Sequence, residues 1–247
     1  MMDKLQTRPQ VAVVIGAGDA TGGAIARRFA AEGLTLVATR RNQEALQPLV
    51  ESIQGAGGTV FGMGCDARKE QAMVELFQHI ESDIGEIAVV IFNIGANVRF
   101  SITETTERVY RKVWEMAALA GFLSGREAAK VMLPRNRGTI IFTGATASLR
   151  GGSGFSAFSG AKFALRALAQ SMARELGPRG IHVAHSIIDG AIDTDFIQQN
   201  FPDMYAKKSE DGILNPEHIA DQYWQLHCQP RDCWTHELDL RPWMETF

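Results

Sequence analysis

The sequence predicts an α/β fold, a doubly wound parallel sheet flanked by helices in three layers (α/β/α). Short apolar runs alternate with longer helical patterns along the chain. Most runs are continuously apolar rather than alternating, as expected of strands that are covered on both faces. A glycine-rich turn joins the first run to the first helical pattern. Such strand–helix alternation implies parallel strands joined by right-handed crossovers.

Seven apolar runs are expected to form the strands. In chain order they are Val11–Ile15, Thr35–Ala38, Thr59–Gly62, Ala88–Phe92, Thr139–Phe142, His182–Ile188 and a last one near Glu237–Leu240. The helical stretches between them are Gly23–Glu32, Asn42–Gln54, Glu70–Ile84, Thr106–Met132 and Ser159–Leu176. No linker, repeat or low-complexity stretch separates a second unit, so residues 1–247 are expected to form a single domain.

The segment from Ile192 to Asn215 has no clear hydrophobic period. It follows a predicted strand and therefore lies at the carboxyl edge of the sheet, where ligands bind in folds of this kind. Long loops in compact domains are often functional, which favours a substrate lid over residues 192–215. The alternative is a surface excursion without a role.

Composition excludes several function classes. The net charge of −3 and the scattered basic residues give no support for a nucleic-acid or membrane surface. No apolar run approaches the length of a membrane span, and the first nine residues lack the apolar core of a signal peptide, so a cytoplasmic location is expected. The three cysteines form no C-x-x-C pair and no cluster with zinc spacing. We expect reduced thiols and no metal site.

The glycine-rich turn V-A-V-V-I-G-A-G-D-A-T-G-G-A-I has the order strand, turn, helix. Gly16 permits a tight turn, and Gly22 lets the backbone approach a pyrophosphate at the helix N-terminus. The strand before and the helix after raise the motif above a lone glycine pattern. A dinucleotide site is predicted here; a purely structural turn is the alternative.

Four further motifs follow in register. They are A-T-R-R after the second run, Asp66 after the third, N-I-G-A (Asn93–Ala96) after the fourth, and D-G-A-I-D-T (Asp189–Thr194) after the sixth. Together with the glycine turn they resemble the short-chain dehydrogenase/reductase family over nearly the full chain. The resemblance implies a Rossmann-type fold, a nicotinamide cofactor and oxidoreductase activity.

The resemblance also implies which residues contact the cofactor. The glycine pattern of the family falls on Gly16, Ala20 and Gly22, so its middle glycine is alanine here. The guanidinium groups of Arg40 and Arg41 suit a 2′-phosphate and favour NADP(H) over NAD(H), although Asp19 opposes this. The implied cofactor residues are Gly16, Gly18, Ala20, Thr21, Gly22, Arg40, Arg41, Asp66, Ala67, Asn93, Ile94, Gly95, Lys162, Gly190, Ile192 and Thr194. For Asp66, capping of the next helix is the alternative role.

The catalytic positions of the resembled family are largely replaced. Aligned on Lys162, the tyrosine position is Phe158, the serine position is Ala145 and the asparagine position is Ala118. Phenylalanine and alanine neither donate nor accept protons, and positioned acid–base groups typically contribute ~10²–10⁴-fold in rate. Two hypotheses follow. One is an NADP(H)-dependent oxidoreductase with a degenerate tetrad, acting on a small carbonyl or activated alkene. The other is an inactive NADP(H)-binding pseudoenzyme that serves as a sensor or scaffold.

No other polar residue has a spacing that identifies it as a substitute proton donor. For each one a cap, a turn or a strand hydrogen bond is the favoured role. The residues considered are Asn97, Arg99, Thr146, Ser148, Arg150, Ser156, Ser159, His185, Asp189 and Tyr205.

Two long helical stretches predict self-association. Trp114–Met132 and Ser159–Leu176 carry apolar or small residues on more than one side, which indicates burial on both flanks. In the resembled family these helices pair across a two-fold axis, which implies a homodimer or homotetramer. The expected partners are thus copies of the chain and a small-molecule substrate, with no nucleic acid and no membrane.

Overall fold

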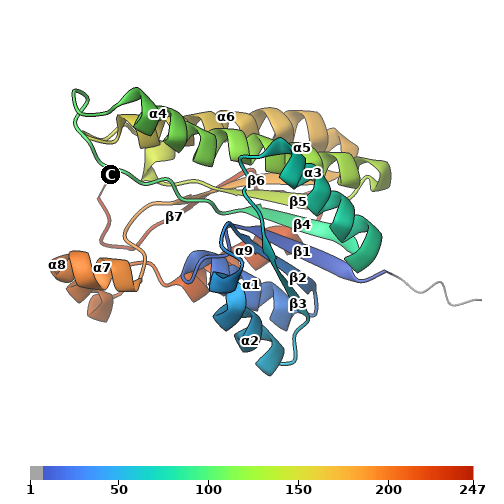
Figure 1. The fold of residues 1–247 in the computed structure, drawn as a ribbon. Coiled ribbons are helices and arrows are strands. Elements are labelled where there is room, and N and C mark those ends of the chain that lie inside the picture. Colours follow the sequence, from blue (N-terminus) through green and yellow to red (C-terminus); the bar gives the residue numbers. More distant parts are fainter. Residues whose placement is uncertain (1–7, 247) are drawn as a thin grey trace, which may run out of the picture.

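The computed structural model describes residues 8–246. The predicted single domain, residues 1–247, and the nine N-terminal residues judged for a signal peptide therefore lie partly outside the described residues. Its centre is a parallel sheet in the order β3-β2-β1-β4-β5-β6-β7 (Figure 1). The strands are β1 Gln10–Ile15, β2 Thr35–Arg40, β3 Val60–Gly64, β4 Glu86–Phe92, β5 Gly138–Thr143, β6 Ile181–Ile188 and β7 Glu237–Leu240. Each predicted strand, and with them the Rossmann-type doubly wound fold, is confirmed.

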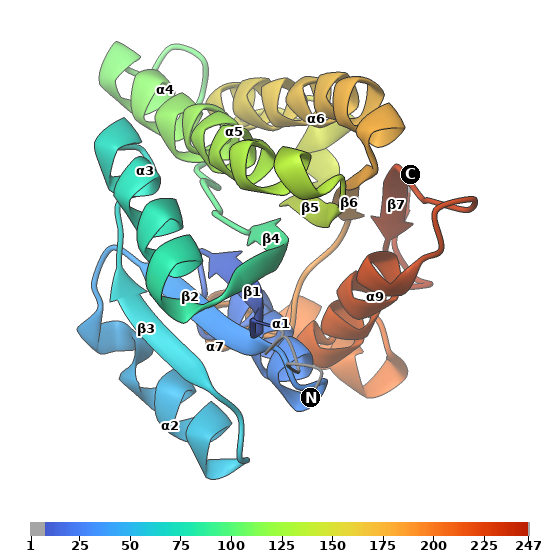
Figure 2. The same ribbon diagram turned by 90° about the vertical axis from the view of Figure 1, so that its right-hand side faces the viewer.

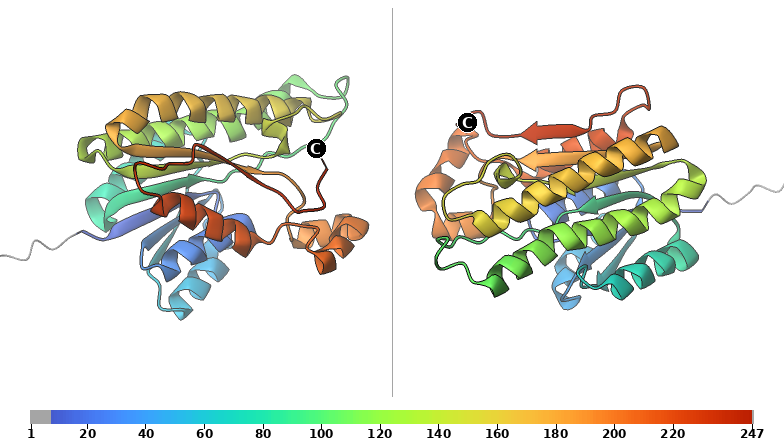
Figure 3. Two further views of the ribbon diagram at one scale, coloured as in Figure 1. Left: turned by 180° about the vertical axis from the view of Figure 1, so that it is seen from behind. Right: turned by 90° about the horizontal axis from the view of Figure 1, so that it is seen from above.

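Helices cover both faces of the sheet, which gives the expected three layers (Figures 1 and 2). One face carries α1 Thr21–Ala31, α2 Gln47–Gly55 and α9 Pro216–Cys228. The other face carries α3 Glu70–His79, α4 Glu107–Trp114, α5 Ala120–Met132 and α6 Ser156–Leu176. Seen from above, α4 and α5 follow one another in one rod, and α6 runs beside this rod across the outside of the molecule (Figure 3, right).

The continuous apolar runs follow from this layering. In β1, Val11, Val13 and Ile15 pack into the core beneath α3, α5 and α6, whereas Ala12 and Val14 pack into the core beneath α1 and α9. Successive side chains of a strand point to opposite faces, so a strand between two cores needs apolar residues at every position. This is why β1 reads as an unbroken apolar run.

The helices differ from the prediction in three places. The sequence predicted one helix over Thr106–Met132. The chain is helical throughout α4 and α5, but a π-helical turn at Glu115–Leu119 lies between these two α-helices. The segment 192–215 contains the short helices α7 (Asp195–Asn200) and α8 (Pro202–Tyr205). Helix α9 was not predicted, although Asn215 caps its start and Pro216 occupies its first turn, which are recognisable start signals.

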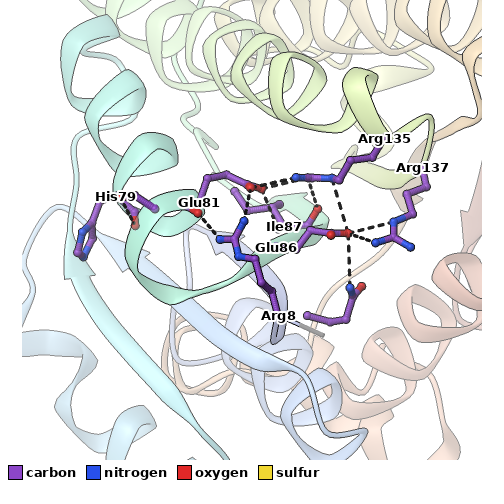
Figure 4. A network of polar contacts seen from close by, with 9 residues as sticks. Arg8, His79, Glu81, Glu86, Ile87, Arg135 and Arg137 are labelled. Atoms are coloured by element: carbon purple, nitrogen blue, oxygen red, sulfur yellow. Dashed lines mark hydrogen bonds and ion pairs between the residues drawn. The ribbon is translucent and has the colours of Figure 1, made fainter. Parts of the chain in front are cut away.

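A network of charged residues joins the amino ends of the strands (Figure 4). Arg135 donates from two nitrogens to Glu81, at 2.9 and 3.0 Å, and Arg137 donates to Glu86 at 2.6 and 3.0 Å. Arg8 also pairs with Glu81. Bidentate arginine–carboxylate contacts are the strong form of such pairs. The network stabilises the edge of the sheet that lies opposite the candidate site.

The strand order reverses between β1 and β4. From β1 the chain proceeds outward through β2 and β3, then returns and proceeds through β4 to β7 on the other side. The crossover helices therefore leave the β1–β4 junction on opposite faces of the sheet and open a crevice at the carboxyl ends of the strands. The residues that close this crevice form the candidate site.

Candidate functional site

A cleft of about 830 Å³ lies at the carboxyl ends of the strands. Its floor comes from the ends of β1, β2, β4 and β5 and from the residues that follow them, and its walls come from the starts of α1 and α6. A crevice of this size and mostly apolar lining, with a few convergent polar groups, is typical of cofactor sites.

The glycine turn between β1 and α1 is shaped by close backbone contacts. Gly16 has φ +91°, and a Cβ on Gly22 would lie 2.4 Å from the Gly16 carbonyl oxygen, so neither position accepts a side chain without movement. The Asn93 amide donates to the same carbonyl oxygen at 3.2 Å and ties the β4 loop to the turn. No side chain caps the start of α1. The N-terminus of α1 thus offers N–H groups and the positive end of a helix dipole to an anion.

The two arginines after β2 differ in their surroundings. Arg40 donates to Asp19 at 3.0 Å and to the Ala45 carbonyl oxygen at 3.0 Å. Arg41 is exposed and makes no hydrogen bond or ion pair with residues 8–246. Both line the cleft. Asp19 therefore has Arg40 as an ion-pair partner, and the guanidinium of Arg41 has none among residues 8–246.

Asp66 lies at the far end of the cleft and pairs with Arg68. Arg68 donates to the carboxylate from Nε at 2.8 Å and from Nη2 at 2.7 Å. These hydrogen bonds hold the pKa of Asp66 below its usual range, and the charge of nearby Arg41 adds to the effect. The Asp66 carboxylate also accepts from the backbone N–H of Arg68 at 3.2 Å, just before α3, so a capping contact and a place in the cleft lining occur together.

Lys162 is buried in the cleft wall, in the second turn of α6. Its ammonium donates to the Thr143 carbonyl oxygen at 2.8 Å and lies 5.9 Å from the centre of the Phe158 ring. Desolvation lowers its pKa from 10.5 to about 8. Since the backbone carbonyls of Thr143 and Ile94 are its hydrogen-bond partners among residues 8–246, the amine is oriented along the cleft floor.

Of the three positions that the sequence analysis identified as replaced, two line the cleft and one does not. Phe158 and Ala145 line the cleft and pack with Ala147 and Ala161 in a small apolar cluster. Ala118 is buried in the π-helical turn of the α4–α5 rod and does not line the cleft. The region around Phe158 is consequently apolar.

Most residues that the sequence predicted as cofactor contacts meet in this one cleft. Gly190 and Ile192 line it from the loop after β6. The exception is Thr194, which lies outside the lining and caps α7 by accepting from the Ile197 N–H. The predicted residues in the lining are Gly16, Gly18, Ala20, Thr21, Gly22, Arg40, Arg41, Asp66, Ala67, Asn93, Ile94, Gly95, Lys162, Gly190 and Ile192.

The cleft also contains residues that sequence reasoning did not assign. Met116 and Phe155 add apolar surface near Phe158. Thr146 and Arg150 bring polar groups from the turn after β5, and Thr146 hydrogen-bonds Asp189. The sequence analysis considered Thr146 and Asp189 separately, and no spacing indicated that they contact each other.

Among residues 8–246, no helix is long and apolar enough to cross a membrane, and no three metal-ligating side chains gather. All three cysteines are free.

Comparisons with known proteins agree with this geometry. The family described as short chain dehydrogenase matches residues 10–204. A human protein, Dehydrogenase/reductase SDR family member 4, is 29% identical over 225 residues, which are 91% of this chain and 78% of its own. The crystal structure of a short-chain dehydrogenase from Rhodopseudomonas palustris is 51% identical, with TM-score 0.81 and coverage of 95% and 99% of the two chains. An alcohol dehydrogenase from Thermococcus sibiricus, complexed with 5-hydroxy-NADP, is 25% identical with TM-score 0.84 and coverage of 96% and 98%.

Proposed function

This chain belongs to the short-chain dehydrogenase family, and from that premise we propose that it is an NADP(H)-dependent oxidoreductase acting on a small carbonyl or activated-alkene substrate. The observation that carries the proposal is the preserved cofactor cleft, in which the glycine turn, Asp66, Asn93 and Lys162 converge. When bound, the nicotinamide supplies the hydride, and the residues of the chain supply binding and orientation.

The residues of the cleft fit a dinucleotide. A Cβ built on Gly18 or Gly95 meets no atom within 4 Å, so both glycines face open space where a ligand backbone can approach closely. The pyrophosphate would lie at the start of α1, and the Asp66 carboxylate would accept from the adenine amino group. Lys162 would donate to the nicotinamide ribose, because its ammonium is held at the cleft floor.

The preference for NADP(H) rests on charge at the end of β2. Arg41 has an uncommitted guanidinium, and Arg40 already compensates Asp19 at 3.0 Å. A 2′-phosphate placed between the two arginines would form charge-assisted hydrogen bonds. NAD(H) offers a ribose hydroxyl there and gains little from two cations.

A second candidate function is cofactor binding without turnover. Phe158, Ala145 and Ala118 remove three polar groups from the chemistry of the resembled family. A protein that binds NADP(H) as a sensor or an oligomer scaffold needs the cleft and not those groups. The apolar cluster around Phe158 is the specific observation in favour of this alternative.

The segment 192–215 is proposed as the substrate lid of a single domain. Ile192 bridges to Leu214, which closes the segment into a compact excursion beside the cleft. Phe196 and Phe201 contact each other edge to face at 6.0 Å, and both are largely exposed. Closure over the cleft would place apolar surface against a substrate. The free thiols of the chain fit a reducing compartment such as the cytoplasm.

Self-association is proposed through the outer face of α4, α5 and α6. Tyr110, Trp114, Phe122 and Phe163 are exposed aromatic residues on these adjacent helices (Figure 3, right). Exposed apolar patches of this kind often mark protein–protein contacts. A homodimer or homotetramer with closed symmetry would bury them.

The test separates cofactor binding from turnover. Titration of NADPH, followed by the fluorescence of the bound cofactor, should give saturable binding that weakens roughly tenfold in Arg41→Ala, whereas NADH binding should change little. A panel of ketones, aldehydes, enones and alcohols should then reveal cofactor turnover. Binding without any turnover would favour the second candidate function.

A gain-of-function variant tests the role of the lost groups. The triple variant Phe158→Tyr, Ala145→Ser, Ala118→Asn should raise carbonyl reduction by roughly 10²-fold or more, because it restores a positioned proton donor. The matched control is Ala145→Ser alone, which adds a hydroxyl but no donor of suitable acidity. A triple variant that binds NADPH and shows no activity would argue that the geometry of the site has diverged as well.

A further inference from the structure

The loop after β6 begins with a buried carboxylate. Asp189 has no exposed surface, and it occupies the position where the resembled motif has proline. Arg241 lies 3.3 Å from one carboxylate oxygen and Arg150 lies 3.8 Å from the other. Burial of a charge is costly unless the charge is paired. The two guanidinium groups therefore pair with the Asp189 carboxylate at the edge of the cleft.

The hydroxyl group of Thr146 hydrogen-bonds this carboxylate. An ionised carboxylate can only accept, so Thr146 Oγ1 is the donor and its single proton is committed to Asp189. Thr146 itself lines the cleft. What its oxygen can still offer to a ligand is its lone pairs. A group that hydrogen-bonds Thr146 must accordingly be a donor, such as an alcohol O–H.

Thr146 is the sequence neighbour of Ala145, the position at which the resemblance implies a serine. Thr146 follows Ala145 directly, and consecutive Cα atoms are separated by ~3.8 Å. Ala145 and Ala147 both belong to the apolar cluster around Phe158. Thr146 thus brings a polar atom to a region where Phe158 and Ala145 have none, and Met116 and Phe155 supply apolar surface for the rest of a substrate.

We propose that Thr146 and Asp189 together bind the hydroxyl group of a secondary alcohol and accept its proton, and that they select the alcohol over the matching ketone. The proposal rests on the oxidoreductase function proposed above, taken in the direction of alcohol oxidation, in which the carbonyl compound named there is the product. In the step, the substrate O–H proton passes to Thr146 Oγ1 while the threonine proton passes to Asp189 Oδ1. A bound oxidised nicotinamide would take the hydride from the carbinol C–H bond as the C=O bond forms.

Ser159 is the competing hydroxyl in the cleft. Its Oγ is buried and has no hydrogen-bond partner among residues 8–246. Such a hydroxyl can donate to a ketone as readily as it accepts from an alcohol, so it would not distinguish the two forms. Tighter binding of the alcohol than of the ketone would therefore indicate a contact with Thr146 and Asp189 and not with Ser159.

The experiment compares two probes of nearly equal shape, cyclohexanol and cyclohexanone. Saturation-transfer NMR titrations of the full-length protein, with and without NADP⁺, should show binding of cyclohexanol about fivefold or more tighter, the effect of about one net hydrogen bond. Thr146→Val should abolish the preference, and Thr146→Ser should keep it. Asp189→Asn should invert it, because an amide donating to Thr146 frees the threonine proton for the ketone. Ser156→Ala, in the first turn of α6 and outside the cleft lining, is the matched control and should behave as the wild type.

Each outcome bears on the proposal. Equal affinities, binding of neither probe, or a preference that survives in Thr146→Val would overturn it. A change in Ser159→Ala but not in Thr146→Val would assign the hydroxyl contact to Ser159 instead. If circular dichroism shows that Asp189→Asn does not fold, the two Thr146 variants decide the matter. Failure of NADPH to bind in the fluorescence titration would count against the proposed function, since the probe preference is also measured without cofactor.

Discussion

At the scale of single residues, the most unusual group is the ammonium of Lys162. In the resembled family the equivalent lysine adjoins a tyrosine, whereas here it faces the Phe158 ring at 5.9 Å. The ring offsets part of the lost hydration through a cation–π contact. Two backbone carbonyls supply the remaining contacts, and no carboxylate pairs with the amine among residues 8–246. Lys162 is consequently a buried amine whose charge is not balanced by a carboxylate among residues 8–246.

The pH dependence of stability should reveal this burial. Folded Lys162 loses its proton near pH 8, whereas an unfolded lysine keeps it to about pH 10.5, so the unfolded chain binds more protons in between. Stability then rises with pH in this window. Relative to Lys162→Met, the wild type should gain roughly 2 kcal/mol in its free energy of unfolding between pH 8 and pH 10.5, measured by urea denaturation.

The control for this prediction is Lys112→Met on the solvent side of α4. Lys112 is exposed, so its removal should leave the pH profile of the wild type unchanged. Parallel profiles of the wild type and Lys162→Met would contradict the prediction, since they would mean that Lys162 titrates alike in the folded and unfolded chain.

Residues differ in how far the sequence identified their roles. A helix brings residue i and residue i+4 to one face, so the sequence alone predicts that Phe158 lies beside Lys162, and the 5.9 Å contact agrees. The assignment of Ala145 as the serine position stays a prediction from the resemblance. The contact of Thr146 with Asp189 was not readable. It joins residues 43 positions apart, on the loops after two adjacent strands, and depends on side-chain rotamers that no spacing rule specifies.

At the scale of elements, Gly144 and His185 pack closely against each other where β5 ends beside β6. Gly144 follows β5, and a Cβ at this position would lie 2.5 Å from His185 Nε2 and 2.7 Å from His185 Cε1. His185 is fully buried in β6, and its Nδ1 contacts Glu237 on β7 at 3.2 Å. Burial lowers the pKa of His185 to about 4, so the imidazole is neutral at pH 7. The imidazole fills the space that a side chain at position 144 would need.

A double-mutant cycle should detect this packing. Gly144→Ala should destabilise the protein by about 1–3 kcal/mol, because the added methyl overpacks a rigid junction. In the background of His185→Ala the same change should cost much less, so the two effects should not add. Denaturant unfolding of the four proteins measures the coupling. Gly151→Ala is the matched control, since a Cβ there meets no atom within 4 Å and the change should stay within about 0.5 kcal/mol.

Elements were predictable where burial imposed a pattern. The strands lie between two helical layers, so their apolar runs were visible in the sequence. The π-helical turn at Glu115–Leu119 was not visible, since the apolar residues continue through it without a break. Helix α9 was missed because its start adjoins the segment 192–215, where no period marked a boundary, although Asn215 and Pro216 carried a start signal.

At the scale of the whole molecule, exposed aromatic side chains gather on the outer side of α4 and α6. Trp114 follows Tyr110 by four residues on α4, which places both on one side of the helix, and the Tyr110 hydroxyl approaches α6 at Gly160. Phe163 continues the same surface one turn along α6. A Cβ on Gly160 would lie 3.0 Å from the Tyr110 oxygen, so the glycine permits α4 and α6 to approach. Together Tyr110, Trp114 and Phe163 give these two helices an exposed aromatic surface.

This surface should govern the association state of the protein. Light scattering after size exclusion should give a dimer or tetramer for the wild type, and the change Trp114→Glu should shift it toward monomer. Truncated aromatic anchors at interface centres typically cost 2 kcal/mol or more, so the dissociation constant should rise roughly 30-fold at least. Phe61→Glu, on the edge strand β3, is the matched control, because Phe61 is exposed to a similar extent but lies far from α4 in the sheet order. A Phe61→Glu protein that dissociates while Trp114→Glu stays assembled would move the interface to the β3 edge. Loss of assembly in Trp114→Glu with NADPH affinity unchanged would show that the interface and the cleft act independently, as expected from their positions on different sides of α6.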